Sequence, residues 1–442
     1  MAVSLNVLAR RVRDFRPVAL PPVDHEKTAL PARQVRKGMA LGLLEGPLSQ
    51  VSLSVASGSL GTGLALMLGA DAFALGILAA LPVVGALVQV PAAWWIQRHG
   101  SRRRLTVIGS LGRQFWLVPA ILLFVPLPAP IKLACFLLAI ALGQMLLALA
   151  VNAWQSWMAD LVPAAVRGRY FGTRGALVSA TGMIVGYGGA WLIDRSEAVG
   201  LAAPAYASLL ILAAACGSLG SILLARQPEP AMQRSTSLCL SALLSMPLHN
   251  PRFRRFASTF MLWQVALGVA SPFMIAYGLT VLRLPLHMLA LTETLTALTS
   301  VLTQPLWGKL ADRMGHRYVL RLCMLLVVPM PWMWVLSTPT YIWPLIVGSL
   351  LSGITWSGIG VTQMSRLMEQ TPADGQCSYF AAFAVATGVP FMVASFGAGA
   401  LMSVVGTEAI TLTSVHFHPY VAFFVASSVL RLATVILGWK SL

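Results

Sequence analysis

Long apolar runs recur along the whole sequence, and they constrain the fold more than any other feature. A helix needs about 20 apolar residues to cross the hydrocarbon core of a bilayer. Hydrophobic residues make up 57% of the chain and charged residues only 10%, too few charges to cover a soluble domain of 442 residues. We therefore expect an all-α integral membrane protein with twelve transmembrane helices. The expected spans are residues 39–68, 72–96, 105–125, 131–157, 171–193, 203–224, 256–281, 286–310, 319–336, 341–364, 379–405 and 421–439.

Lysine and arginine are distributed unevenly between the connections of these spans. With the N-terminus in the cytoplasm, 26 of the 31 basic residues fall on the cytoplasmic side and three in external connections. Short cytoplasmic loops of membrane proteins are enriched in basic residues, so we expect both termini in the cytoplasm and the protein in a bacterial inner membrane. This distribution also accounts for the formal net charge of +17, so no nucleic-acid partner is expected.

The two halves of the chain repeat one another. Residues 98–102 match residues 313–317 in two arginines and the glycine between them, at a shift of 215 positions. Six spans, a polar segment and six more spans are typical of a duplicated bundle, whose binding site lies near the bilayer midplane between the halves. The expected domains are a basic tail at 1–37, an N-terminal bundle at 38–225, a linker at 226–255 and a C-terminal bundle at 256–442.

One connection carries a compact motif, Gly-Lys-Leu-Ala-Asp-Arg-Met-Gly-His-Arg at residues 308–317. It resembles the loop signature of the major facilitator superfamily. The resemblance implies two pseudo-symmetric six-helix bundles that transport a solute by alternating access. Gly308 is expected to let two helices approach closely, and Asp312 to cap a helix N-terminus or pair with an arginine. The residues of the motif and of its first-half copy are Gly308, Asp312, Arg313, Gly315, Arg317, Arg98, Gly100 and Arg102.

The first-half copy departs from the family pattern. Gln97 stands where the family uses an acidic residue as a latch between the bundles. Glutamine keeps the hydrogen-bonding capacity but loses the charge. The arginine motif of drug–proton antiporters is also missing from the fourth span. The resemblance therefore reaches the superfamily and no particular subfamily.

Two ionisable residues lie at similar depth in the first and third spans. Charges inside a span are costly and call for a reason. Glu45 lies eight residues beyond Lys37, about 12 Å into its helix at 1.5 Å per residue, and Arg113 lies nine residues beyond Arg104. Both spans enter from the cytoplasm, so we expect a buried Glu45–Arg113 ion pair. A static structural role and a gating role both remain open.

Glu293 is the other acidic residue well within a span, in the outer half of the eighth. Burial favours the neutral form of a carboxyl group, which suits a proton carrier. We interpret Glu293 as the coupling protonation site or as a contact for a cationic group of the solute; a solvated or paired residue near the outer mouth is the alternative.

Other polar residues in the spans are weaker candidates. Arg431 lies in the last span, which is peripheral in this fold, and is expected to snorkel or to pack. Polar and aromatic residues on the spans expected to surround the cavity could line it. These candidates are Gln50, Gln144, Asn152, Gln155, Gln264, Tyr277, Thr355, Trp356 and Gln363.

These patterns favour a secondary transporter of a small organic solute, either proton-coupled or facilitative. The alternative is an assembly factor or scaffold with the same fold and little transport. No HExxH, GxSxG or P-loop motif supports an enzyme, and neither a cofactor nor a metal is expected. The expected partners are the solute, a proton in the coupled case, and the lipid bilayer, with the chain acting as a monomer. The identity of the solute and the direction of transport remain open.

Overall fold

The computed structural model describes residues 30–442 except 100, 231–248, 371–375, 407–409 and 413–414. The described part is almost entirely helical. One short antiparallel hairpin, β1 (Ile410–Leu412) with β2 (Val415–Phe417), is an exception to the all-α expectation and pairs Thr411 with His416. The expected linker 226–255 lies partly outside the described residues.

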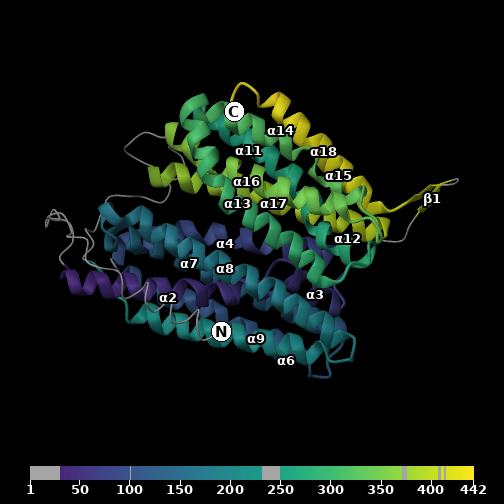
Figure 1. The fold of residues 1–442 in the computed structure, drawn as a ribbon, viewed down its shortest axis with the longest axis horizontal. Helices are drawn as coiled ribbons and strands as arrows, with labels where there is room; N and C mark the ends of the chain where they lie inside the picture. Colours follow the sequence, from purple (N-terminus) through teal and green to yellow (C-terminus); the bar gives the residue numbers. More distant parts are fainter. Residues whose placement is uncertain (1–29, 100, 231–248, 371–375, 407–409, 413–414) are drawn as a thin grey trace.

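The first half crosses the molecule six times (Figure 1). Two of its crossings are broken into shorter helical pieces, and the other four are continuous helices. The pieces in chain order are α2 (Ala32–Ala56) with α3 (Gly58–Met67), α4 (Ala72–His99), α5 (Arg102–Ser110) with the 3-10 helix η1 (Leu111–Trp116) and α6 (Leu117–Leu122), α7 (Ala129–Leu161), α8 (Ala164–Glu197) and α9 (Ala202–Ala225).

The second half repeats this arrangement with six further crossings. Counted over both halves, nine helical segments of the described residues are long and apolar enough to span a membrane. The crossings of the second half are α11 (Pro251–Ala270) with η2 (Ser271–Phe273) and α12 (Met274–Thr280), α13 (Leu286–Met314), α14 (His316–Val327) with α15 (Met330–Val335), α16 (Trp343–Glu369), α17 (Gln376–Val405) and α18 (Pro419–Leu437).

Successive crossings alternate in direction, so the connections gather at two ends of the molecule. We call the end with the α4–α5 and α13–α14 connections and residues 226–230 and 249–250 the linker end. The end with the α3–α4, α8–α9 and α12–α13 connections is the far end. In Figure 1 the linker end lies at the left and the far end at the right.

Glycine sets two of the breaks between helices. Gly58 has φ +61° and separates α2 from α3, and Gly315 has φ +89° and ends α13. Residues with a Cβ rarely adopt these angles. The break at Gly58 also begins a new helix within a crossing, so the first backbone N–H groups of α3 lack partners within that helix.

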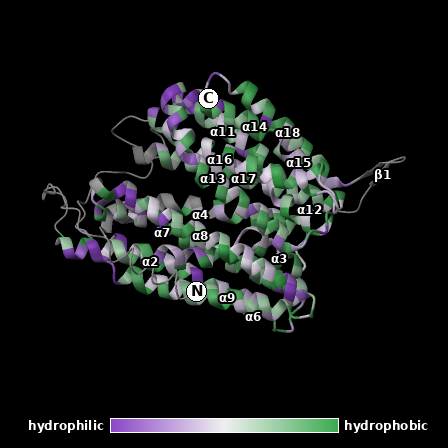
Figure 2. Ribbon diagram, in the orientation of Figure 1, coloured by the Kyte–Doolittle hydropathy of each residue, from purple (hydrophilic) through white to green (hydrophobic). Residues whose placement is uncertain are grey.

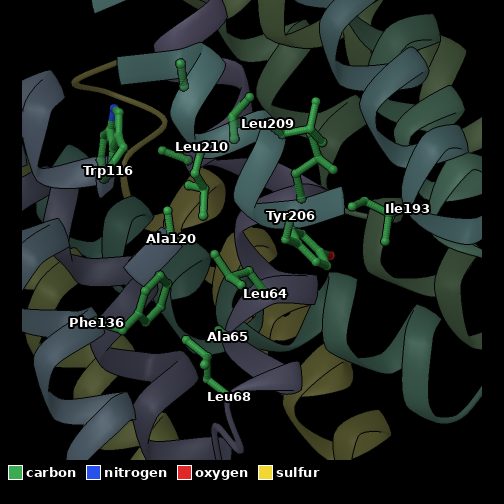
Figure 3. Close-up of a cluster of buried hydrophobic side chains, with 14 of the residues drawn as sticks. Leu64, Ala65, Leu68, Trp116, Ala120, Phe136, Ile193, Tyr206, Leu209 and Leu210 are labelled. Carbon is green, nitrogen blue, oxygen red and sulfur yellow. The ribbon is translucent and has the colours of Figure 1, made fainter. Parts of the chain in front are cut away.

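Apolar side chains fill the core and also cover the outside. Figure 3 shows part of the core of the first half, where Trp116, Phe136 and Tyr206 are buried together. Ile184 is 72% exposed and Val404 84% exposed. In Figure 2 the helices are mostly green and white, and purple gathers at their ends. An apolar surface of this kind suits lipid rather than water.

Candidate functional site

A buried charge cluster lies inside the first half. Glu45 of α2 accepts hydrogen bonds from Arg113 Nη2 at 3.2 Å and from Arg174 Nη2 at 2.9 Å. Ser49 Oγ also donates to this carboxylate. The guanidinium of Arg174 lies 4.3 Å from the ring centre of Trp154, within cation–π distance. One carboxylate thus holds two arginines, and the aromatic face helps to accommodate the excess positive charge.

Small residues make room for Arg113. It lies in η1, between α5 and α6, and faces Gly217 and Gly220 of α9. A Cβ at Gly217 would come within 2.7 Å of Arg113 Cβ, and one at Gly220 within 3.1 Å of Arg113 Nη1. Glycine at these positions therefore lets α9 pack directly on the arginine.

The structure brings Glu45 and Arg113 together, and adds a partner that sequence reasoning missed. We counted Arg174 among the basic residues of a cytoplasmic connection, although it lies three residues inside the expected fifth span, which starts at residue 171. Helix α8 instead begins at Ala164, so Arg174 lies within the helix and reaches Glu45. The position of Arg174 inside the expected span was the signal available in the sequence. The static role and the gating role of this ion pair both stay predictions.

Glu293 joins the two halves near the far end. Its Oε1 accepts a hydrogen bond from the backbone N–H of Ser59 at 2.9 Å, and its Oε2 from Ser59 Oγ at 3.0 Å. Glu293 belongs to α13, whereas Ser59 lies in the first turn of α3, just after the break at Gly58. The carboxylate of one half therefore sits at a helix N-terminus of the other, where the exposed N–H groups and the helix dipole favour a negative charge.

Asp194 makes the reciprocal contact from the first half. Its carboxylate, near the C-terminal end of α8, accepts from the backbone N–H of Leu286 at 2.9 Å and of His287 at 2.7 Å. The ring Nδ1 of His287 lies 2.7 Å from Asp194 Oδ2. These contacts cap the N-terminus of α13, the helix that also carries Glu293. Sequence reasoning did not single out Asp194, which lies at the edge of an apolar run.

Glycines bring the two halves into backbone contact at the same end. A Cβ at Gly76 of α4 would come within 2.5 Å of the Ser395 carbonyl oxygen of α17, and Gly76 and Gly399 face each other across this contact. Contacts this close require residues without side chains. The far end is thus held by two carboxylate caps and by close packing of α4 on α17.

A cavity of about 610 Å³ opens inside the second half. Its wall includes Glu293 and Thr296 of α13, Trp356 of α16, Trp334 of α15 and Arg431 of α18. The carboxylate that joins the two halves therefore also lines a space large enough for a small organic molecule.

Arg431 packs inside the second half, which is one of the two placements expected for it. It is 3% exposed, lines the cavity and donates from Nη1 to the carbonyl oxygen of Val327 at 3.1 Å. A side chain that snorkels would reach the polar interface, so the structure agrees with the packing expectation and not with snorkelling. α18 packs against α11, α14 and α15, and this packing turns Arg431 inward.

The other expected cavity residues are dispersed. Trp356 lines the cavity, whereas Tyr277 packs against Phe424 in a far-end aromatic cluster, with ring centres 5.3 Å apart. Thr355 is buried and donates to the Leu351 carbonyl oxygen of its own helix at 2.9 Å. Gln50, Gln144, Gln264 and Gln363 are half-buried, Gln155 is exposed, and the side chain of Asn152 lies outside the described residues.

The contacts made by the loop motif of the second half differ from those expected. Gly315 requires its positive φ, but a Cβ at Gly308 would meet nothing within 4 Å, so the close-approach explanation is wrong here. Asp312 and Arg313 are exposed, and Asp312 has no partner among the described residues. Arg317 donates to the carbonyl oxygen of Lys440 and so ties the C-terminal residues to the linker end.

Arg102 of the first-half copy is buried rather than loop-exposed. It is 1% exposed, pairs with Asp160 of α7 and donates from Nη2 to the Pro230 carbonyl oxygen at 3.1 Å. Its backbone N–H donates to Glu229 Oε1 at 2.7 Å. These bonds fix the start of the linker against α5 and α7. Gly100 and the side chain of Arg98 lie outside the described residues.

A second, smaller cavity of about 390 Å³ lies at the far end, between the two halves. Asp71 and His418 line it. Burial lowers the pKa of His418 below its usual value, because the charged imidazolium is poorly solvated there. His418 stacks on Tyr420 with ring centres 4.9 Å apart, which suits a neutral ring.

The sequence profile of the Major Facilitator Superfamily matches residues 48–395 and 282–440. The chain belongs to this superfamily. The family and the fold are those of multi-pass membrane transporters rather than of enzymes. A comparison with curated protein sequences gives no match.

Solved structures of transporters share the fold. A mutant of the nucleoside transporter NupG aligns with a TM-score of 0.70 and 13% identity, covering 91% of this chain and 99% of that one. A D-xylose–proton symporter gives 0.68 and 15%, covering 91% and 96%. A bacterial homologue of the iron transporter ferroportin in an inward-facing state gives 0.66 and 14%, covering 92% and 98%. Identities this low establish the fold alone.

Proposed function

We propose that the protein is a proton-coupled secondary transporter that moves a small organic solute by alternating access, with Glu293 as the coupling protonation site. The position of Glu293 carries this proposal. Its carboxylate bonds to Ser59 across the two halves and also lines the cavity of the second half. A single carboxyl group at both positions can couple its protonation to solute binding in the cavity and to the contact between the halves.

Protonation of Glu293 changes the strength of that contact. Hydrogen bonds to an ionised acceptor are roughly twice as strong as neutral ones, so the bonds from Ser59 weaken when the carboxylate takes up a proton. The far end then depends on the Asp194 cap and on the packing of α4 against α17. Parting of the halves there would expose the cavity to the far side.

The distribution of basic residues supports an orientation for this cycle. Lys and Arg concentrate at the linker end, which we assign to the cytoplasm of a bacterial inner membrane with both termini inside. The far end then faces outward, and the joined far end corresponds to a conformation closed on that side. All the groups in this proposal belong to one chain, in keeping with a monomer.

The test is uphill transport by the purified chain in proteoliposomes. Thermal-shift screening of a solute library first identifies a ligand, and its accumulation is then measured with and without an imposed proton gradient. We expect gradient-driven accumulation by the wild type and its loss in Glu293→Gln, with solute exchange retained. Glu197→Gln, which alters an exposed acid at the far end of α8, is the matched control and should accumulate solute normally.

Two results would overturn the proposal. A Glu293→Gln protein that still concentrates solute along a proton gradient would remove Glu293 from the coupling role. Binding without flux for every ligand found would favour the assembly-factor or scaffold alternative over transport.

A further inference from the structure

Arg431 is a buried cation in the wall of the cavity of the second half. It lies twelve residues beyond Pro419 in α18, about 18 Å along the helix, and is 3% exposed. In the part of the chain that the structure describes, no carboxylate lies within 4.0 Å of its guanidinium, and its Nε has no hydrogen-bond partner. The other arginines buried among the helices differ, since Arg102 pairs with Asp160 and Arg113 with Glu45.

The local backbone supplies a hydrogen-bond acceptor for only one N–H group of this guanidinium. The carbonyl oxygen of Val327 would normally accept from the residue four positions later, but that residue is Pro331, which has no N–H. Arg431 Nη1 donates to this carbonyl oxygen at 3.1 Å. A neutral amide side chain could make the same bond. The positive charge therefore needs a further reason, because an unpaired charge is among the most costly groups to bury.

We propose that Arg431 binds the carboxylate group of the transported solute inside the cavity of the second half. This inference rests on the proposed transport function and specifies its substrate class. A guanidinium presents parallel N–H donors that match the two oxygens of a carboxylate. The cavity holds about 610 Å³, and Trp334, Trp356 and Phe391 supply apolar walls for the organic part of such a molecule.

The charge balance of the cavity favours a monocarboxylate. Among the lining residues that the structure describes, Glu293 and Arg431 are the ionisable ones. With Glu293 protonated, one carboxylate on Arg431 leaves the cavity neutral, whereas a phosphate dianion would leave it negative. The ionisable side chains of Asp194 and His287 meet at the N-terminus of α13, the helix that carries Glu293, but they do not line this cavity. Carboxylate and proton are therefore expected to bind together.

Binding to the full purified chain tests the proposal, in nanodiscs of phosphatidylcholine alone so that anionic lipid is excluded. The probes are acetate, hexanoate and phenylacetate, each compared with its uncharged amide, and inorganic phosphate. We expect at least one carboxylate to raise the unfolding temperature while its amide and phosphate do not. Its affinity should rise as the pH falls, and this pH dependence should be lost in Glu293→Gln.

Two substitutions at the same site separate charge from folding. Arg431→Gln keeps an amide donor for the Val327 carbonyl oxygen but removes the charge, and should weaken carboxylate binding by about 10- to 100-fold, the range of a charged hydrogen bond. Arg431→Lys keeps the charge without the planar fork and should retain part of the affinity even if Arg431→Gln fails to fold. Arg195→Gln, at an exposed arginine of α8, is the control and should bind as the wild type.

The outcomes distinguish this inference from the function on which it rests. Carboxylate binding that depends on Arg431 but never produces flux would keep the anion site and reject transport. Proton-driven flux of an uncharged solute, with Arg431→Gln as active as the wild type, would keep transport and reject the carboxylate assignment. Equal binding of a carboxylate and its amide, or carboxylate binding unchanged in Arg431→Gln, would also overturn the assignment.

Discussion

Three arginines among the helices of this protein meet three different environments. Arg113 shares the carboxylate of Glu45 with Arg174, and Arg102 pairs with Asp160 at the linker end. Arg431 lines a cavity and has no carboxylate within 4.0 Å among the described residues. Counting residues from the ends of the spans was sufficient to predict that Glu45 and Arg113 lie at one depth. It was not sufficient for Arg431, because the direction in which a side chain points depends on how neighbouring helices pack.

The charge cluster of the first half leads to a stability prediction. Glu45→Gln removes the carboxylate from Arg113 and Arg174, and breaking a buried ion pair by removing one partner costs about 3–5 kcal/mol. We expect a clearly lower unfolding temperature for the detergent-solubilised variant, measured by loss of the monodisperse peak on size-exclusion chromatography after heating. Glu197→Gln, at an exposed position, should unfold as the wild type does. Equal unfolding temperatures would show that the cluster does not stabilise the first half.

At the scale of elements, α13 is the helix that connects the site to the contact between the halves. Asp194 caps its N-terminus, Glu293 extends from it to Ser59, and its inner face lines the cavity. The length and hydropathy of the eighth apolar run predict this helix and the position of Glu293 within it. Its partners lie more than ninety residues away in the chain, at Asp194 and Ser59, and a single sequence contains no signal that pairs positions so far apart.

The close contact between α4 and α17 leads to a prediction for a larger side chain at Gly76. Gly76→Val adds a branched side chain where even a Cβ would come within 2.5 Å of the Ser395 carbonyl oxygen, so the far end should open. Spin labels at Val199 and Tyr341, exposed positions in opposite halves, would report a longer distance by pulsed electron resonance in a cysteine-free background.

A matched glycine controls for the added side chain itself. Gly397 lies on the same α17, and a Cβ there would meet nothing within 4 Å. Gly397→Val should leave the distance between the labels as in the wild type. If Gly76→Val also leaves it unchanged, the contact between α4 and α17 does not hold the far end together.

At the scale of the whole molecule, the twofold repeat determines most of the architecture. The twelve crossings of the structure follow the apolar runs of the sequence, and the family comparison confirms the fold. The breaks within crossings were not predicted. The apolar run 39–68 continues through the break at Gly58. Hydropathy indicates whether a segment prefers lipid or water, and it contains no information on backbone angles.

Orientation in the membrane is a prediction for the whole chain. Single cysteines replace Val199 at the far end and Met314 at the linker end, both exposed, in a cysteine-free background. With the linker end in the cytoplasm, a membrane-impermeant maleimide added to intact spheroplasts should label the first and not the second. After permeabilisation both should react. The opposite pattern would reverse the orientation assigned from the basic residues.

The reciprocal caps of Asp194 and Glu293 have a consequence for the role of water. Both carboxylates and the helix termini they cover lose their protein partners when the far end parts, and groups this polar cannot remain bare. Solvent has to take over each hydrogen bond as it breaks. In the proposed cycle, far-end opening is therefore a hydration step, and its equilibrium depends on the activity of water as well as on protons and solute.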